Sequence, residues 1–210
     1  MIRPRLLIAT RSAHKLAELR DLLALDRSEL VSLDDFAVEG DVEETGSTFE
    51  ANARLKARHG ARLTGLPTLA DDSGLEVDAL DGGPGVRTRR YAGENATDAD
   101  NNAKLLAALA GVPPELRTAR YVCALALALP DATGPLGGLP VRLVRGTCRG
   151  RIAAAAWGTS GFGYDPIFQP ASEPPGGRTL GEWSQAAKNK ISHRGAAARR
   201  MRPILLDLGF

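Results

Sequence analysis

The chain has 210 residues, of which 43% are hydrophobic and 25% charged, and its formal net charge at pH 7 is +2. This composition is typical of a globular protein and excludes a disordered or fibrous chain. No apolar run approaches the ~18 residues of a membrane span, and the apolar stretch near the start is too short for a signal-peptide core. We therefore expect a cytoplasmic protein with no membrane partner, in which Cys123 and Cys148 are reduced.

Segments of strand and helix character alternate in the first half of the chain. The expected elements are a strand at 5–9, a helix at 15–25, a helix from 47 to about 60, strands at 68–71 and 74–80, and a helix from 97 to about 111. The second helix is expected to begin at a capping box formed by Ser47 and Glu50. Thr97 is the expected N-cap of the third helix, because acidic residues occupy the first turn after it.

The second half is more typical of antiparallel sheet. Strands are expected at 121–129, 141–147 and 150–153, with a Pro/Gly-rich connection at 130–140 and a last amphipathic helix at 195–208. The sequence contains no internal repeat and no linker-like break. We therefore expect one α/β domain over residues 1–210, arranged as two lobes around a cleft.

The first candidate site lies where the first strand turns into the first helix. Its residues are Thr10, Arg11, Ser12, Ala13, His14 and Lys15. A turn of this kind presents backbone N–H groups and a helix N-terminus, which favour a phosphate, and Lys15 adds a positive charge. The glycines of a P-loop are absent. The alternative is an ordinary turn with Ser12 as N-cap.

A second candidate site is the acidic sequence Asp71-Asp72-Ser73. Adjacent strand residues point to opposite faces, so only one of the two aspartates can face a given site. A carboxylate here suits Mg²⁺ or a general base that activates water. Earlier in the chain, Glu44 precedes the expected helix cap and is available to a metal, while Lys56 lies two turns into that helix and can reach a phosphate. Solvated charges are the alternative for each.

Two further segments carry glycines, aromatic rings and cations. In the segment 158–166, Phe162 and Tyr164 offer faces on which a base can stack, and the glycines allow close approach of the backbone. In the segment 188–194, Lys188 suits a phosphate, while His193 and Arg194 can donate hydrogen bonds to a base or a phosphate. A glycine-rich hairpin and a solvated helix start are the respective alternatives.

Taken in order, these segments resemble the inosine triphosphate pyrophosphatase family. The family reads T-x-N-x-x-K, E-T-G-x-T-F-x-x-N-A-x-x-K, A-D-D-S-G-L-x-V-D-A-L-x-G-x-P-G-V, G-x-x-G-F-G-Y-D-P-x-F and K-N-x-x-S-H-R. The matching segments here are 10–15, 44–56, 70–86, 158–168 and 188–194. The sequence departs from the family by Ser12 in place of Asn, by an extra cation at Arg89 and by a longer connection at 131–140.

The resemblance implies a fold, an activity and a cofactor. The implied fold is an elongated mixed β-sheet with flanking helices, forming two lobes around a central nucleotide-binding cleft. The implied reaction is Mg²⁺-dependent hydrolysis of dITP, ITP or XTP to a nucleoside monophosphate and pyrophosphate, which removes these nucleotides before they enter DNA or RNA. A homodimer is implied too, with no stable nucleic-acid partner.

The resemblance also implies a role for each matching residue. Asp72 corresponds to the metal-binding, water-activating aspartate, and Glu44 to a second metal ligand. The implied substrate-binding residues are Thr10, Arg11, Ser12, Ala13, His14, Lys15, Lys56, Ser73, Phe162, Gly163, Tyr164, Asp165, Lys188, His193 and Arg194. Arg194 is expected to donate to the 6-oxo group of the purine, an acceptor that adenine lacks.

Two other classes of function stay open at this point. One is a related pyrophosphatase that acts on pyrimidine or modified triphosphates, against which the His193-Arg194 pair argues. The other is a nucleotide- or nucleic-acid-binding module without catalysis. The basic residues are dispersed along the chain and aromatic stacking platforms are few, which disfavours a nucleic-acid surface.

Overall fold

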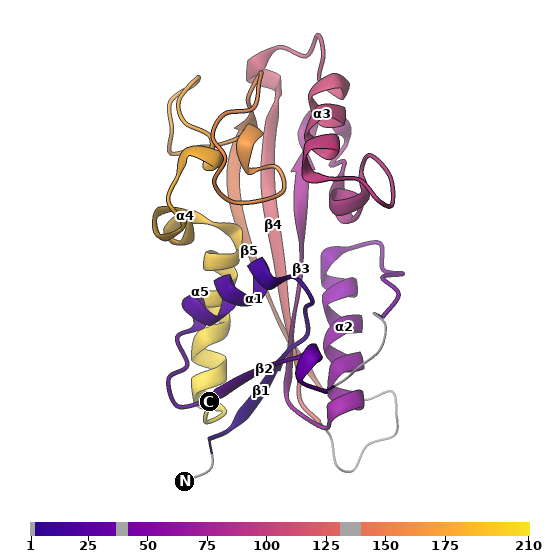
Figure 1. The fold of residues 1–210 in the computed structure, drawn as a ribbon, viewed down its shortest axis with the longest axis vertical. Coiled ribbons are helices and arrows are strands. Elements are labelled where there is room, and N and C mark those ends of the chain that lie inside the picture. Colours follow the sequence, from indigo (N-terminus) through magenta and orange to yellow (C-terminus); the bar gives the residue numbers. More distant parts are fainter. Residues whose placement is uncertain (1–2, 37–41, 131–139) are drawn as a thin grey trace. The chain divides into compact units, whose positions relative to one another are not determined.

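The computed structural model describes residues 3–36, 42–130 and 140–210 (Figure 1). The strands are β1 (Arg5–Ile8), β2 (Glu29–Ser32), β3 (Thr68–Val77), β4 (Thr118–Ala128), β5 (Val141–Ile152) and β6 (Phe168–Pro170). The α-helices are α1 (Ala13–Leu23), α2 (Phe49–Thr64), α3 (Asp98–Ala108), α4 (Gln185–Ile191) and α5 (His193–Asp207). Most of the expected connection at 130–140 lies outside the described residues. Within the described ranges, no helix is long and apolar enough to cross a membrane.

The strands form one mixed sheet in the order β2-β1-β3-β4-β5-β6. Strand β1 is parallel to both β2 and β3, with Leu7 opposite Thr68 and Ile8 opposite Leu69 in the second pair. Strand β6 is antiparallel to β5. The α/β class with a mixed sheet and flanking helices is confirmed.

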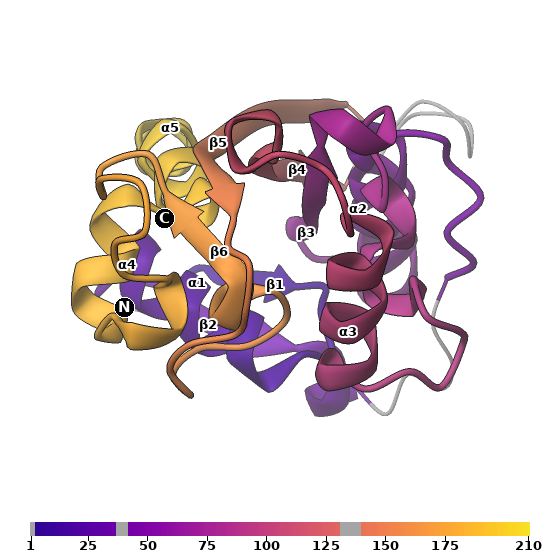
Figure 2. The same ribbon diagram turned by 90° about the horizontal axis from the view of Figure 1, so that it is seen from above.

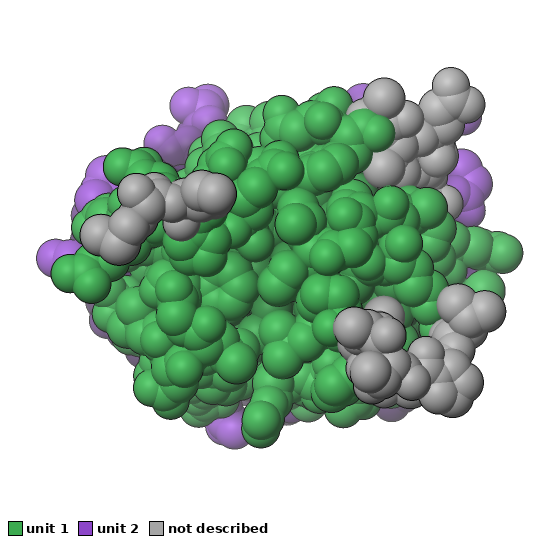
Figure 3. Space-filling model, turned by 90° about the horizontal axis from the view of Figure 1, so that it is seen from below, with its two compact units in different colours: residues 1–72, 123–146, 194–210 green, residues 73–122, 147–193 purple. Residues whose placement is uncertain are grey.

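The chain divides into two compact units. Unit 1 comprises residues 1–72, 123–146 and 194–210, and unit 2 comprises residues 73–122 and 147–193. Figure 3 colours the described residues of unit 1 green and those of unit 2 purple. Strands β3, β4 and β5 each contribute residues to both units.

In unit 1, helices cover both faces of the sheet. Helix α2 lies on one face, and α1 and α5 lie on the other (Figures 1 and 2). Apolar side chains from β1, β4, α1 and α5 pack into one buried cluster, which includes Leu6, Ile8, Leu19, Leu23, Leu125, Met201 and Leu205. This cluster holds β3 in place from the side that carries α1 and α5.

The bounds of α2 differ from the prediction at both ends. Its N-cap is Thr48, whose Oγ1 accepts a hydrogen bond from the Ala51 N–H at 3.1 Å, so the expected cap at Ser47 was wrong by one residue. The helix continues through Gly60 to Thr64 and ends at Gly65, which has φ +68°. Gly60 is required by packing, because a Cβ there would lie 2.8 Å from Thr68 Cγ2.

Unit 2 has a hydrophobic core of its own. Side chains of α3, β3 and β4 pack with the ring of Phe168, and the cluster includes Leu75, Val77, Leu105, Leu109, Tyr121, Ile152 and Phe168. Helix α3 begins at the predicted N-cap, Thr97, whose side chain exchanges hydrogen bonds with Asp100 in a capping box. Both free cysteines are buried, Cys123 in unit 1 and Cys148 in unit 2.

Two predicted strand breaks are absent. The expected strands at 68–71 and 74–80 form the single strand β3, and those at 141–147 and 150–153 form the single strand β5. Asp71 and Asp72 therefore lie within a strand rather than after its end, with only 2% and 6% of their surfaces exposed. Buried carboxylates require charged or hydrogen-bonding partners, and these partners define the candidate site.

Candidate active site

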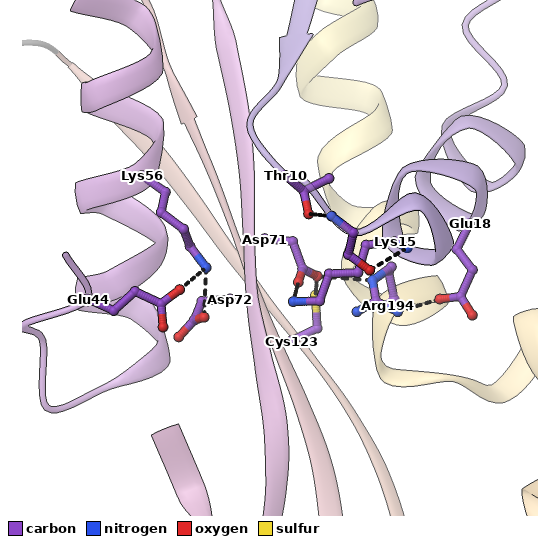
Figure 4. Close-up of polar contacts among 10 residues, drawn as sticks. Thr10, Lys15, Glu18, Glu44, Lys56, Asp71, Asp72, Cys123 and Arg194 are labelled. Atoms are coloured by element: carbon purple, nitrogen blue, oxygen red, sulfur yellow. Dashed lines mark hydrogen bonds and ion pairs between the residues drawn. The ribbon is translucent and has the colours of Figure 1, made fainter. Parts of the chain in front are cut away.

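Strand β3 directs the side chains of Asp71 and Asp72 to opposite faces of the sheet (Figure 4). Successive side chains of a strand alternate between faces, so this arrangement follows directly from the adjacent positions. Asp72 meets Lys56 of α2, while Asp71 meets Lys15 of α1 and Arg194 of α5. All these residues belong to unit 1.

On the Asp72 face, one ammonium group is shared by two carboxylates. Lys56 Nζ donates to Asp72 Oδ1 at 2.8 Å and to Glu44 Oε1 at 3.0 Å. Burial raises the pKa of Asp72 above its ordinary value, although Lys56 acts in the opposite direction. Burial lowers the pKa of Lys56, but the two carboxylates outweigh this and raise it. Lys56 is therefore a cation, and Asp72 is a stronger base than an exposed aspartate.

The same two carboxylates fit the magnesium ion implied by the sequence. Glu44 and Asp72 place oxygens close enough to contact one cation, the Lys56 ammonium. Protein sites for Mg²⁺ usually supply only one or two carboxylates, because water and substrate phosphates complete the coordination shell. Among the described residues, no group of three or more His, Cys, Asp and Glu side chains could form an all-protein metal centre. The donor set thus suits a metal that arrives with a phosphate ligand.

On the Asp71 face, a buried carboxylate has three partners. Asp71 Oδ1 accepts from Lys15 Nζ at 2.5 Å, and Oδ2 accepts from Arg194 Nε and Cys123 Sγ, each at 3.0 Å. Burial alone would raise the pKa of Asp71, but Arg194 and Lys15 hold it well below its usual value. Arg194, which is 1% exposed, also donates to Glu18 of α1. This network fixes Lys15 at the start of α1.

The first loop leads directly into this network. Ser12 is the N-cap of α1, as in the alternative interpretation of this loop, and its Oγ accepts a hydrogen bond from the Lys15 N–H at 3.4 Å. Arg11 forms an ion pair with Asp34 at 3.0 Å, and His14 is exposed in the first turn of the helix. The loop thus presents the N-terminus of α1 beside a lysine, an arrangement that favours a phosphate group.

In unit 2, the segment Phe162–Asp165 is held by hydrogen bonds from within it and from Lys188. Asp165 Oδ2 accepts from Lys188 Nζ at 2.7 Å and from the Phe162 N–H at 3.0 Å. Lys188 is 3% exposed, and its ammonium lies 4.7 Å from the centroid of the Phe162 ring. Gly161 has φ +78°, and a Cβ there would lie 2.1 Å from Asp165 Oδ2, so this position requires glycine. Lys188 is thus paired with a carboxylate, whereas the sequence suggested a phosphate.

Helix α3 supplies two residues that the sequence analysis missed. Asp98 Oδ2 accepts from the Gly163 N–H at 2.6 Å, and Asn102 Nδ2 donates to the Gly163 carbonyl at 3.0 Å. Tyr164 donates its hydroxyl to the carbonyl of Thr88 at 2.7 Å. Nothing in the motif spacing linked α3 to the glycine-rich segment, because these contacts join residues 61 or more positions apart.

The residues expected at the base therefore fall into two separately described groups. Phe162, Tyr164, Asp165 and His193 belong to unit 2, whereas Arg194 belongs to unit 1. Unit 2 also contains Gly163, expected to contact the substrate, and Lys188, expected at a phosphate. The His193 ring stacks on Tyr121, with centroids 4.7 Å apart and planes 10° apart. Ser73 is half-buried at the first position of unit 2. A fully buried arginine needs carboxylate partners, which explains the contacts of Arg194 with Asp71 and Glu18.

Comparison with known proteins identifies the family. The model of the Ham1 family matches residues 6–204. The chain belongs to the Ham1 family. Among curated relatives, it is 50% identical to the "dITP/XTP pyrophosphatase" of Geobacillus kaustophilus, over 93% of this chain and 91% of that protein. It is 47% identical to the "dITP/XTP pyrophosphatase" of Nocardia farcinica, over 99% of this chain and 98% of that protein.

Solved Ham1 structures share the fold. A HAM1 protein from Coxiella burnetii superimposes with a TM-score of 0.85 at 42% identity, covering 97% of this chain and 99% of that chain. The Staphylococcus aureus Ham1 protein gives a TM-score of 0.84 at 35% identity, with the same two coverages. The family membership indicated by the sequence motifs is confirmed.

Proposed function

We propose that this Ham1-family protein is a nucleoside-triphosphate pyrophosphatase that hydrolyses dITP, ITP and XTP to the monophosphate and pyrophosphate. The observation that carries the proposal is the pair of lysine–aspartate contacts on the two faces of β3, Lys15 with Asp71 and Lys56 with Asp72. Relatives of near full length that are named dITP/XTP pyrophosphatases support the same reaction. Its cellular role would be to keep non-standard purine nucleotides out of DNA and RNA.

For the metal, we propose that Glu44 and Asp72 hold Mg²⁺. When bound, the ion would supply Lewis-acid stabilisation of charge on phosphoryl oxygens. Both carboxylates already contact a cation in this structure, the Lys56 ammonium. Lys56 is thereby held beside the proposed metal ligands, where its charge can offset a substrate phosphate as well.

The chemistry of the chain's own residues follows from their charge and burial. Asp72 would accept a proton from the attacking water, a task favoured by the raised pKa that burial gives its carboxylate. Lys15, fixed by Asp71, and Lys56 would offset the negative charge that shifts along the triphosphate in the transition state. The loop at residues 10–12 and the first turn of α1 would bind a phosphate through their backbone N–H groups.

For the base, we assign Phe162, Tyr164, Asp165 and His193 to the purine. This assignment is supported by the contacts that hold the segment Phe162–Asp165 in place. Asp98 and Asn102 bind the Gly163 backbone, and Lys188 binds Asp165. We further propose that Arg194 donates to the 6-oxo group. A donor without acceptor capacity pairs with that oxygen and leaves the amino group of adenine unpaired, and a mismatch of this kind can discriminate by ~10⁴ or more.

We also propose that residues 1–210 act as one domain and assemble as a homodimer in the cytoplasm. Activity is tested by incubating the purified protein and Mg²⁺ with dITP, XTP, ATP and dUTP in parallel. Hydrolysis of dITP and XTP at rates well above those of ATP and dUTP is the expected result. Preference for dUTP would instead favour a pyrimidine-specific enzyme, and no hydrolysis would favour a binding module.

A further inference from the structure

Tyr121 of β4 lies within the aromatic cluster of unit 2 and is absent from the motifs described above. Its side chain is buried, with 7% of the residue exposed. Its ring stacks nearly parallel on the imidazole of His193 and makes a tilted contact with Phe168 at a centroid distance of 4.7 Å. The stack restricts the plane in which the His193 ring can lie.

The hydroxyl group of Tyr121 is not explained by packing. Its oxygen is buried close to the Tyr164 N–H and the Asp165 carboxylate but forms no hydrogen bond of good geometry with any described residue. An unsatisfied buried hydroxyl is unfavourable, and phenylalanine would supply the same ring without it. Burial raises the pKa of Tyr121 well above its ordinary value, and the charge of Asp165 adds to this effect. The group is therefore a neutral phenol that retains its proton.

The surroundings of this hydroxyl are the residues assigned to the purine. A Cβ at Gly163 would lie 4.0 Å from the Tyr121 oxygen, and the Asp165 charge acts on the same phenol. Asp98 and Asn102 hold the Gly163 backbone, and Lys188 holds Asp165. The ring and the hydroxyl of Tyr121 thus face two different parts of the proposed base-binding group.

We propose that Tyr121 is a positioning residue for purine recognition: its ring sets the plane of His193, and its hydroxyl becomes a hydrogen-bond donor to the segment Gly163–Asp165 when the base binds. This inference rests on the proposed function and extends it to a residue outside the family motifs quoted above. Tyr121 has no role in the chemical step under this inference. Its substitution should therefore change the affinity for substrate and leave turnover unchanged.

Two substitutions separate the ring from the hydroxyl. Tyr121→Phe keeps the ring, and Tyr121→Leu removes the stack. We expect Tyr121→Phe to raise KM for dITP about 3- to 10-fold and Tyr121→Leu by about 10- to 100-fold, with kcat within about 2-fold of wild type in both. Because Tyr121→Phe deletes a buried hydroxyl whose hydrogen bonds are poorly formed, its melting temperature should stay close to or exceed that of the wild type. A purely structural hydroxyl would leave KM unchanged.

A spectroscopic measurement without substrate tests the stack independently. The chain has three histidines, so the imidazole proton resonances of His193 are assigned by their loss in His193→Gln. Tyr121→Leu should shift these resonances, because the ring current of the stacked phenol is removed, whereas Tyr121→Phe should leave them close to wild type. Tyr91→Phe, which removes the hydroxyl of a tyrosine packed against the same hydrophobic cluster, serves as the matched control for both readouts.

The outcomes distinguish this inference from the proposed function. If wild-type protein does not hydrolyse dITP, the proposed function fails and the purine-recognition role fails with it, whatever the resonances show. If dITP is hydrolysed but Tyr121→Phe keeps the wild-type KM, the hydroxyl role is overturned. Unchanged KM and unchanged His193 resonances in Tyr121→Leu would overturn the positioning role as a whole.

Discussion

Asp71 and Asp72 are adjacent in sequence, yet each is bound to a different lysine on a different face of β3. Asp71 accepts from Lys15 at 2.5 Å, and Asp72 accepts from Lys56 at 2.8 Å. Because their partners differ, we assign the two aspartates different roles. Asp71 is neutralised by two cations and serves to fix them, whereas Asp72 shares one lysine with Glu44 and keeps a raised pKa.

This separation predicts different roles in catalysis. Asp72→Asn should lower kcat for dITP at least ~10²-fold, because an amide can neither accept the proton nor hold Mg²⁺ as well. Nucleotide binding, measured by isothermal titration calorimetry, should be largely retained. Asp26→Asn, an exposed aspartate of unit 1, is the control and should behave as wild type. Near wild-type turnover of Asp72→Asn would mean that another carboxylate is the base.

Arg194 offers a test of base discrimination. Arg194→Ala should reduce the ratio of kcat/KM for ITP to kcat/KM for ATP roughly 10- to 100-fold. The reason is that the 6-oxo acceptor of ITP is left unpaired, which costs about 1–3 kcal/mol. If Arg194 serves only to fix Asp71 and Lys15, both substrates will lose activity equally and the ratio will not change.

The same substitution should also reduce stability. Removal of Arg194 leaves the buried carboxylates of Asp71 and Glu18 without this cation, and breaking a buried ion pair in this way costs about 3–5 kcal/mol. Urea unfolding followed by circular dichroism measures the change in the free energy of unfolding. Arg199→Ala, at an exposed position of α5, should change it by no more than about 0.5 kcal/mol.

Substitution of Gly60 tests whether steric packing or helix propensity dominates at this position. Alanine is intrinsically favoured over glycine within a helix by about 1 kcal/mol. A Cβ at Gly60 would nevertheless lie 2.8 Å from Thr68 Cγ2 and 3.0 Å from Leu7 Cδ2. We expect Gly60→Ala to destabilise the protein by about 1–3 kcal/mol in thermal unfolding, as overpacked substitutions do. A stabilised variant would show that α2 can move away from β1 and β3 at little cost.

The two cysteines should be unreactive in the folded protein. Burial raises the pKa of Cys148 to about 11 and that of Cys123 well above its ordinary value. At pH 8 only about one Cys148 thiol in 1,000 is then the reactive thiolate. Ellman's reagent should therefore detect almost no thiol in the native protein and two per chain in guanidinium. Fast native labelling of either thiol would contradict the buried, reduced pair.

Local patterns in the sequence predicted much of the fold. The predicted cap at Thr97 is confirmed, and Ser12 caps α1 as the alternative interpretation had it, because N-capping depends only on residues within one turn. The prediction of a strand break after Asp71 was wrong because it used local signals alone. Polar residues and a glycine usually mark a turn, but the partners that allow these aspartates to stay in a buried strand come from α1, α2 and α5.

The candidate site was only partly predictable for the same reason. The motifs named Lys188, Asp165 and Arg194, but no spacing rule shows that Lys188 pairs with Asp165 or that Arg194 pairs with Asp71, 123 positions away. Tyr121 and Asn102 lie outside all of the motifs quoted above. Their contacts depend on how distant segments meet, which one sequence does not display.

The central claim concerns which phosphoanhydride bond breaks. The most direct measurement is the phosphorus NMR spectrum of the products formed from dITP and Mg²⁺, with inorganic pyrophosphatase absent. Cleavage between the α- and β-phosphates predicts equal amounts of dIMP and pyrophosphate and no orthophosphate. The appearance of orthophosphate together with dIDP would show cleavage at the terminal phosphate and would contradict the assignment.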